Sequence, residues 1–249
     1  MEVDYSAMKR MIATVTACLL ISACATDEHK REMEYFNDGN LFFAKEKFEP
    51  SQKAYQSILD ESPDSPYRIH SLLGSADAYY LQKEYIASAP IYARFVELYP
   101  QDDLTPHALF YEGMSYYQDM VPLKKDQTNA GKALEVFNEF VRKYPTHFAT
   151  PFVLDKITSL NDRLAEKEFD VALFYFNTTA YISCIGRVDR LLERWPATRF
   201  KADALMLKGK SYLAEQSYDK GNAVLRQIAA DFPATDAGME AAALLSVKR

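Results

Sequence analysis

The stretch from Ala202 to Pro233 reads ADALMLKGKSYLAEQSYDKGNAVLRQIAADFP, and it decides the fold. Apolar and small residues recur in each half at spacings that place them on one face of a helix. These residues are Leu205, Gly209 and Tyr212 in the first half and Tyr218, Leu225 and Ile228 in the second. Gly209 and Gly221 predict a close approach of the two helices, and Pro233 ends the second because proline lacks an N–H. The stretch therefore predicts two amphipathic helices that pack as a pair.

The same pair recurs along the chain, and each predicted pair closes on a proline. The closing prolines are Pro63, Pro100, Pro145, Pro196 and Pro233, and successive ones are 37, 45, 51 and 37 residues apart. Large, small and aromatic residues recur before each proline in the order typical of tetratricopeptide (TPR) repeats, whose standard length is about 34 residues. Five units in one register predict an all-α fold, a right-handed α-solenoid of about five TPR helix pairs with a C-terminal capping helix.

The prolines also divide the chain into expected units. A solenoid over 35–249 is predicted to contain units of about 35–65, 66–103, 104–149, 150–197 and 198–233, with a cap over 234–249. The two long spacings predict an insertion over 120–129 and a long helix over about 151–177. Pro90 predicts a kink or a late start in the helix expected over 84–99. Cys184 occupies a small-residue position, so we interpret it as a packing residue.

The N-terminal segment has the pattern of a bacterial lipoprotein signal. A basic start, Met8 to Arg10, precedes an apolar run from Met11 to Ala23 that is too short for a stable transmembrane helix, which needs about 20 residues. Leu20-Ile21-Ser22-Ala23-Cys24 then forms a lipobox at the boundary to polar sequence. We therefore expect a signal peptide over 1–23, a lipidated Cys24 carrying N-acyl and S-diacylglycerol chains, and a tether over 24–34.

Several alternatives remain open for this segment. Glu2 and Asp4 are unusual in a signal peptide, which makes Met8 an alternative start. Val15 to Cys18 also resembles a lipobox, but it would leave too short an apolar run behind Arg10. An ordinary signal peptide is the remaining alternative. Ala25 is not the aspartate that commonly retains bacterial lipoproteins at the inner membrane, so the outer membrane is the expected location, with the protein on its periplasmic face.

Composition argues against several classes of function. The net charge is −6, and nucleic-acid binding requires a basic surface. The four histidines are scattered over the chain, and none pairs with Cys or carboxylates at metal-ligand spacing. No nucleophile motif or phosphate-binding glycine loop is present in the 249 residues. We therefore expect a non-enzymatic protein without a metal or other cofactor.

Several segments together resemble the BamD family, also called ComL, the lipoprotein of the β-barrel assembly (Bam) machinery of Gram-negative outer membranes. The resemblance rests on the lipobox, the five repeats and four segments: Lys125–Thr128 (Lys-Asp-Gln-Thr), Ala133–Phe137, Lys143–Pro145 and Leu164–Phe176. It implies a scaffold that binds a periplasmic domain of the barrel-forming, BamA-type subunit, other Bam lipoproteins, and the C-terminal segments of unfolded outer-membrane proteins. It also places contact with the barrel-forming subunit on Arg187; the alternative is that Arg187 is one more solvated arginine, and the family match favours the contact.

A groove for the unfolded substrate is expected on the first helices of units one to three. Its residues recur at matching helix positions and are Phe36, Asn40, Phe43, Asp77, Tyr80, Met114 and Tyr117. Phe43, Tyr80 and Tyr117 are expected to form an apolar ladder, whereas Asn40 and Asp77 are expected to bond the backbone of an extended peptide. The alternative is that the ladder packs between repeats.

Two further classes of function are weighed. A TPR lipoprotein can act as a pilotin, which escorts a secretin to the outer membrane; the Asp-Gln-Thr insertion favours barrel assembly instead. A lipid-anchored enzyme would need a polar constellation that the sequence does not display. Copurification with the anchored protein separates the first two functions by which partner is recovered.

Overall fold

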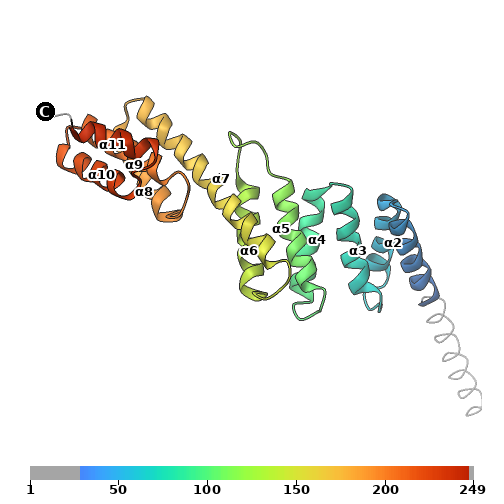
Figure 1. Ribbon diagram of the computed structural model, residues 1–249. Coiled ribbons are helices and arrows are strands. Elements are labelled where there is room, and N and C mark those ends of the chain that lie inside the picture. The colour runs from blue at the N-terminus through green and yellow to red at the C-terminus, as the bar shows by residue number, and fades with distance from the viewer. Residues whose placement is uncertain (1–28, 247–249) are drawn as a thin grey trace, which may run out of the picture. The chain divides into compact units, whose positions relative to one another are not determined.

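The computed structural model describes residues 29–246, and within this range the chain forms helices and no strands (Figure 1). The predictions for residues 1–28, including the signal peptide and Cys24, lie outside the described residues. The chain divides after Asp119 into two compact units, unit 1 before Met120 and unit 2 from Met120 onward. No helix in the described range has both the length and the apolar character that crossing a membrane requires.

Unit 1 consists of five helices in sequence order. A helix over residues 29–44 is followed by α2 (Phe48–Glu61), α3 (Arg68–Leu81), α4 (Tyr85–Leu98) and α5 (Thr105–Gln118). Each pairs with its neighbour along the chain, and a core of buried apolar residues from α3, α4 and α5 includes Leu72, Tyr92 and Phe95. Most of this core lies between successive helices, as a repeat architecture requires.

Unit 2 has six helices, one of which is much longer than the others. Its helices are α6 (Thr128–Lys143), α7 (Thr150–Asn177), α8 (Tyr181–Arg194), α9 (Lys201–Ala214), α10 (Tyr218–Asp231) and α11 (Asp236–Ser246). The long helix α7 has 28 residues, as predicted, and packs against α6 and α8. Helix α11 packs on α10, in the position expected of the cap. The predicted all-α fold of TPR helix pairs is confirmed.

The turn inside a helix pair has the same backbone in four of the five pairs. One non-glycine residue of each turn has a left-handed φ: 57° at Glu46, 64° at Lys83, 63° at Thr179 and 58° at Gln216. The next residue donates its N–H to the carbonyl five positions earlier, at 2.8–2.9 Å. This bond pattern satisfies carbonyls at the helix C-terminus, which have no partner within the helix. Between α5 and α6, the insertion over 119–127 takes the place of this turn.

The predicted close approach at Gly209 and Gly221 is confirmed. A Cβ atom added to Gly221 would lie 2.7 Å from Cδ2 of Leu213 and 3.2 Å from the carbonyl oxygen of Gly209. A side chain at position 221 would therefore displace Leu213 and crowd the Gly209 carbonyl, so the small size of glycine suits this crossing of α9 and α10.

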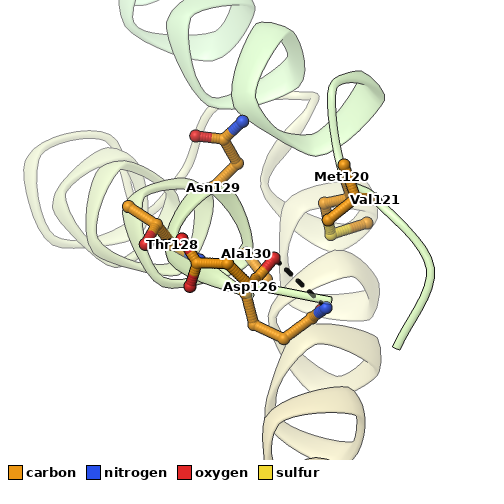
Figure 2. Close-up of a pocket in the computed structure, with 7 residues that line it drawn as sticks. Met120, Val121, Asp126, Thr128, Asn129 and Ala130 are labelled. Carbon is orange, nitrogen blue, oxygen red and sulfur yellow. Dashed lines mark hydrogen bonds between the residues drawn. The ribbon is translucent and has the colours of Figure 1, made fainter. Parts of the chain in front are cut away.

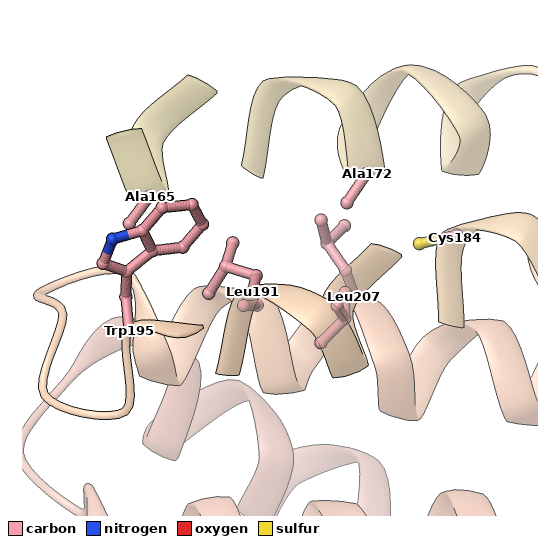
Figure 3. Packing of buried hydrophobic residues seen from close by; sticks show 8 residues of the cluster. Ala165, Ala172, Cys184, Leu191, Trp195 and Leu207 are labelled. Carbon is pink, nitrogen blue, oxygen red and sulfur yellow. The ribbon is translucent and has the colours of Figure 1, made fainter. Parts of the chain in front are cut away.

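Two details of the sequence-based predictions concern α4 and α8. Helix α4 begins at Tyr85, so the late start expected from Pro90 is wrong. Proline has no N–H, so the carbonyl of Ile86, four residues earlier, loses its partner within the helix. Both Pro90 and Ile86 are exposed. The expected kink stays a prediction. Cys184 is fully buried between α7 and α8, and burial raises the pKa of its thiol. Its interpretation as a packing residue is confirmed (Figure 3).

Candidate functional site

The predicted groove residues all belong to unit 1, and we refer to them as the first-helix face: Phe36, Asn40, Phe43, Asp77, Tyr80, Met114 and Tyr117. They come from the helix over 29–44, α3 and α5. Asn40 is exposed, Met114 is buried, and the other five are partly buried. The face is therefore shared between solvent and the interior of the unit.

Asn40 and Asp77 both accept a hydrogen bond from a tyrosine on the following helix. The Tyr55 hydroxyl donates to Oδ1 of Asn40 at 2.8 Å, and the Tyr92 hydroxyl donates to Oδ1 of Asp77 at 2.6 Å. Both pairs are separated by 15 residues, so they are equivalent contacts in successive repeats. Nε2 of His107, on α5, lies 2.9 Å from the same Asp77 oxygen. Asp77 therefore links three helices of unit 1.

Sequence reasoning singled out the acceptors and missed these donors. Tyr55 and Tyr92 could have been found from their constant separation from Asn40 and Asp77. Burial raises the pKa of Tyr92, and the negative charge of Asp77 raises it further, so the phenol remains a protonated donor. The bond from the Tyr55 hydroxyl orients the Asn40 amide. Because the amide oxygen accepts this bond, the NH₂ group points away from Tyr55.

The expected ladder residues have ring contacts inside unit 1. Phe43 lies edge-on to Phe48, with ring centroids 5.5 Å apart. Tyr80 contacts Tyr85 of α4 at 5.3 Å and Tyr111 of α5 at 4.9 Å. The contact of Tyr80 with Tyr111 lies between two repeats, as the alternative of packing between repeats predicted. The side chain nevertheless keeps part of its surface exposed, so packing and ligand binding are not exclusive.

Phe36 contacts aromatic residues at the start of α3. The ring of Phe36 is stacked on Tyr67 with centroids 4.8 Å apart, and His70 approaches its edge at 6.3 Å. Phe36 is therefore part of an aromatic cluster between the first helix and the start of α3.

In unit 2, Arg187 lies on α8 and points toward α7. Its Nη1 atom is 3.3 Å from Oε2 of Glu168, and the guanidinium lies 5.8 Å from the centre of the Tyr175 ring. About a quarter of each charged side chain is exposed, at 28% for Arg187 and 26% for Glu168. Arg187 is thus a largely buried residue that already pairs with a carboxylate of its own chain.

Acidic side chains of α7 bond to the connection between α8 and α9. Oδ1 of Asp162 accepts bonds from the Thr198 hydroxyl and the Arg199 N–H, each at 3.2 Å. Glu166 pairs with the Arg199 guanidinium at 3.3 Å. Beneath these polar contacts, Ala165 and Ala172 of α7 face Leu191 and Trp195 from the α8 side (Figure 3).

The insertion is attached to α7 by two basic side chains. Arg163 donates from Nε to Oε1 of Gln127 at 2.7 Å and from a terminal nitrogen to the carbonyl of Val121. Lys167 donates to the Lys124 carbonyl at 3.2 Å. The Gln127 amide also donates to the carbonyls of Pro122 and Lys125, each at 3.1 Å. Gln127 therefore folds the insertion on itself and ties it to α7.

The beginning of α6 completes this arrangement. The Asp126 carboxylate accepts the Thr128 N–H at 3.2 Å and its hydroxyl at 2.6 Å, so it satisfies the first N–H of α6, which has no partner within the helix. A small pocket of about 150 Å³ lies between Met120 and Val121 on one side and residues 126–130 on the other (Figure 2). The Asp-Gln-Thr motif thus has a structural role in each of its three residues.

No group of three or more His, Cys, Asp or Glu side chains in residues 29–246 is arranged to hold a metal ion.

The fold places the chain among TPR-type helix-pair repeat proteins, and comparison with known sequences specifies the family. The family model described as "YfiO: Outer membrane lipoprotein" matches residues 28–241. The chain belongs to this family, which confirms the resemblance found in the sequence.

Three of the similar curated proteins share one name. "Outer membrane protein assembly factor BamD" of Caulobacter vibrioides is 25% identical over 81% of this chain and 69% of its own length. The protein of the same name from Rickettsia prowazekii is 21% identical over 90% of this chain and 92% of its own length. The Neisseria gonorrhoeae protein is 25% identical over 82% and 84%.

Among solved structures, the "TPR2AB-domain:pHSP90-complex of yeast Sti1" has a TM-score of 0.41 and 15% identity, covering 87% of this chain and 83% of that one. YrrB, "a TPR protein with an unusual peptide-binding site", has a TM-score of 0.36 and 15% identity, covering 89% and 97%.

Proposed function

We propose that this protein is a lipid-anchored periplasmic scaffold in the assembly of outer-membrane β-barrel proteins, acting within a Bam complex and without catalysis. The observation that carries the proposal is the family match over residues 28–241, joined to relatives named outer membrane protein assembly factor. Recovery of a barrel-forming subunit with the tagged, membrane-extracted protein supports the proposal. Recovery of a secretin in its place would favour the pilotin alternative.

The anchor is proposed to be a lipid on Cys24. Stable membrane attachment takes more than one acyl chain, and a bacterial lipoprotein cysteine carries two or three. We expect the protein to fractionate with the outer membrane, and we expect Cys24→Ser to release it or to stall its processing. Retention of the Cys24→Ser protein at the outer membrane would show that the anchor lies elsewhere.

Arg187 is proposed to contact a carboxylate on a periplasmic domain of the barrel-forming, BamA-type subunit. A guanidinium can bind a carboxylate through two parallel hydrogen bonds, and more than a quarter of the Arg187 side chain is exposed beside Glu168. Arg187→Glu should weaken the complex, but it would also bring two glutamates together inside unit 2. A loss of binding by that variant alone would therefore have two explanations.

A charge swap separates the two explanations. The double variant Arg187→Glu with Glu168→Arg restores an ion pair between α7 and α8 while reversing the charge at position 187. If Arg187 contacts the partner, the double variant should recover the melting temperature of the wild type but still bind weakly. Recovery of both stability and binding would mean that Arg187 acts only inside the chain.

The first-helix face is proposed to hold extended segments of unfolded barrel substrates. Exposed Asn40 and the partly exposed rings of Phe43 and Tyr80 support this, because extended peptides are bound through backbone hydrogen bonds and side-chain contacts together. Phe43→Ala with Tyr80→Ala should weaken binding of a peptide from a barrel C-terminus. Tyr85→Ala is the control, because Tyr85 packs on Tyr80 from α4 and lies off the face. Equal loss of peptide binding in both proteins would assign the ladder to packing.

A further inference from the structure

The turn between α6 and α7 presents the most exposed aromatic ring of the described chain. Phe148 leaves 89% of its surface exposed, the largest fraction of any large apolar side chain in residues 29–246. Phe152, four residues later at the start of α7, is 45% exposed. Single exposed apolar residues are common, whereas two aromatic rings at one helix end indicate a contact surface. We call Phe148, Phe152 and the neighbouring Lys156 the α7 tip.

Contacts inside unit 2 brace the turn that carries Phe148. The centre of the His147 ring lies 4.3 Å from that of Phe148 and 5.3 Å from that of Phe140, which is fully buried. The Thr150 hydroxyl donates to the carbonyl of Tyr144 at 2.7 Å and joins the two ends of the turn. Phe148 is therefore presented to solvent by a fixed turn, next to a ring that is anchored in the core.

The charges near the tip are mainly positive, in contrast to the chain as a whole, whose net charge is −6. Basic residues outnumber acidic residues between positions 140 and 160: Arg142, Lys143 and Lys156 against Asp155. Lys143 pairs with Glu139 of α6 at 2.6 Å, and Arg142 is exposed. A local excess of positive charge fits an anionic partner.

Lys156 combines this charge with one of the rings. Its Nζ atom lies 4.8 Å from the centre of the Phe152 ring. The methylene groups of a lysine can lie along apolar surface while the ammonium group reaches a polar phase. A ring and an ammonium group on one surface suit a boundary where apolar material meets anionic groups, and the headgroup region of a phospholipid bilayer is such a boundary.

The small size of the tip favours a lipid surface over a protein partner. A stable protein interface buries roughly 800 Å² on each partner, and one aromatic side chain buries about 150–250 Å². Phe152 is already half covered, so the two rings by themselves fall well short of such an interface. A bilayer needs no complementary shape, and its phosphates attract basic side chains.

We propose that the α7 tip is a second membrane contact, in which Phe148 and Phe152 enter the headgroup region of the bilayer while Arg142 and Lys156 bind lipid phosphates. The inference rests on the proposed lipid anchor at Cys24, which holds the chain at the bilayer surface. A chain that is already anchored needs only a weak second contact, because the second binding step is then intramolecular. The contact attaches unit 2 itself to the membrane.

The test places a tryptophan probe in the full-length lipidated protein. The protein is reconstituted in vesicles of phosphatidylethanolamine and phosphatidylglycerol that carry brominated acyl chains, which quench a tryptophan inserted among them. Phe148→Trp should lose most of its added fluorescence and shift its emission to shorter wavelength. Its melting temperature should stay that of the wild type, because position 148 is exposed. Phe152→Trp provides a second probe of the tip.

The same helix offers a matched control. Phe174 is 61% exposed and lies in the last turn of α7, about 33 Å along the helix from Phe152, so Phe174→Trp should escape quenching. The native Trp195 is 8% exposed and gives the background. Exchange of phosphatidylglycerol for phosphatidylcholine should reduce quenching at position 148, because it removes the net negative charge of the surface. Arg142→Gln with Lys156→Gln should have the same effect.

The outcomes separate the tip from the anchor. Phe148→Trp protein that floats with the vesicles but is not quenched would overturn the tip and leave the anchor intact. Equal quenching of Phe148→Trp and Phe174→Trp would also overturn it, because the contact would then not be specific to the tip. An emission shift that appears only on concentrating the protein in detergent, or only with the barrel-forming subunit, would assign the tip to a protein partner instead. Failure to float would overturn both proposals.

Discussion

The two units are held together in different ways. In unit 1, hydroxyl groups and rings link one helix to the next: Tyr55 to Asn40, Tyr92 to Asp77, and Tyr80 to Tyr111. In unit 2, acidic side chains of one long helix, α7, bond to the elements that follow it, and its basic side chains hold the insertion that precedes it.

The difference shows that helices of regular repeats and a long helix that interrupts them are held by different side-chain contacts. Successive short helix pairs bring equivalent positions together, so the same tyrosine hydroxyl contact occurs in two successive repeats. A helix of 28 residues extends beyond a single partner, and its extra turns need separate contacts. Charged side chains suit these contacts because the extra turns are partly exposed and the side chains are long.

The largest expected effect comes from the core of unit 2. Leu191→Ala removes a fully buried side chain of α8 and leaves a cavity against α7. We expect a loss of about 2–5 kcal/mol in the free energy of unfolding. Hydrogen exchange at the α8 and α9 amides, read with chemical denaturation, measures it. A loss below about 1 kcal/mol would show that charged contacts, and not the core, hold α8 to α7.

The next effect tests how tightly unit 1 is packed around Tyr55. A Cβ atom on Gly74 would lie 2.6 Å from Cε2 of Tyr55, and one on Gly39 would lie 2.5 Å from Cε1 on the other edge of the ring. The ring has no room to move, so Gly74→Ala should destabilise unit 1 by about 1–3 kcal/mol. The control is Gly131→Ala, which has open space and should be stabilising. Similar thermal shifts in the two variants would contradict this account.

Removal of one hydroxyl should have a smaller effect. Tyr92→Phe retains the ring and deletes the bond to Asp77, which we expect to cost about 1.5 kcal/mol, as for other bonds to charged groups. Tyr111→Phe is the comparison, because its ring belongs to the same cluster and contacts Tyr92 and Tyr80. Thermal unfolding of both proteins measures the difference. A larger loss in Tyr111→Phe would show that the repeated hydroxyl contact does not stabilise unit 1.

The tie between the insertion and α7 should contribute less again. Arg163→Met keeps most of the side-chain length but removes both bonds to the insertion, at a cost of about 1 kcal/mol. We expect faster proteolysis over residues 120–127 than in the wild type. Lys167→Met, which removes a single bond of 3.2 Å, should have a weaker effect. Unchanged cleavage in Arg163→Met would mean that Gln127 alone holds the insertion.

The smallest expected effect is a stabilisation at a turn. Thr179 has a left-handed φ of 63°, which is unfavourable for a β-branched residue. Thr179→Gly should therefore stabilise unit 2 by about 0.5–1 kcal/mol, because glycine adopts this conformation without strain. Lys83→Gly, at the equivalent turn of unit 1, should gain less because lysine is unbranched. Loss of stability in Thr179→Gly would show that the threonine side chain contributes contacts that outweigh the strain.

Sequence patterns predicted the helices well because burial in a repeat is local. Each helix packs mainly on its neighbours along the chain, so the period of apolar residues and the closing prolines report almost all of the fold. Candidate site residues were harder to interpret. Asp77 was predicted as a peptide contact from its position, and sequence reasoning did not find that Tyr92 and His107 bond to it.

By itself, the sequence determined the class of fold, the number of helix pairs, the glycine crossing at Gly209 and Gly221, the burial of Cys184 and the family. These depend on spacing and residue size, which are written along the chain. Tertiary structure alone decided that Arg187 pairs with Glu168, that Arg163 holds the insertion, and that Phe148 stays exposed. Such features depend on which side chains from separate helices meet, or fail to meet, after packing, and helical periodicity carries no record of that.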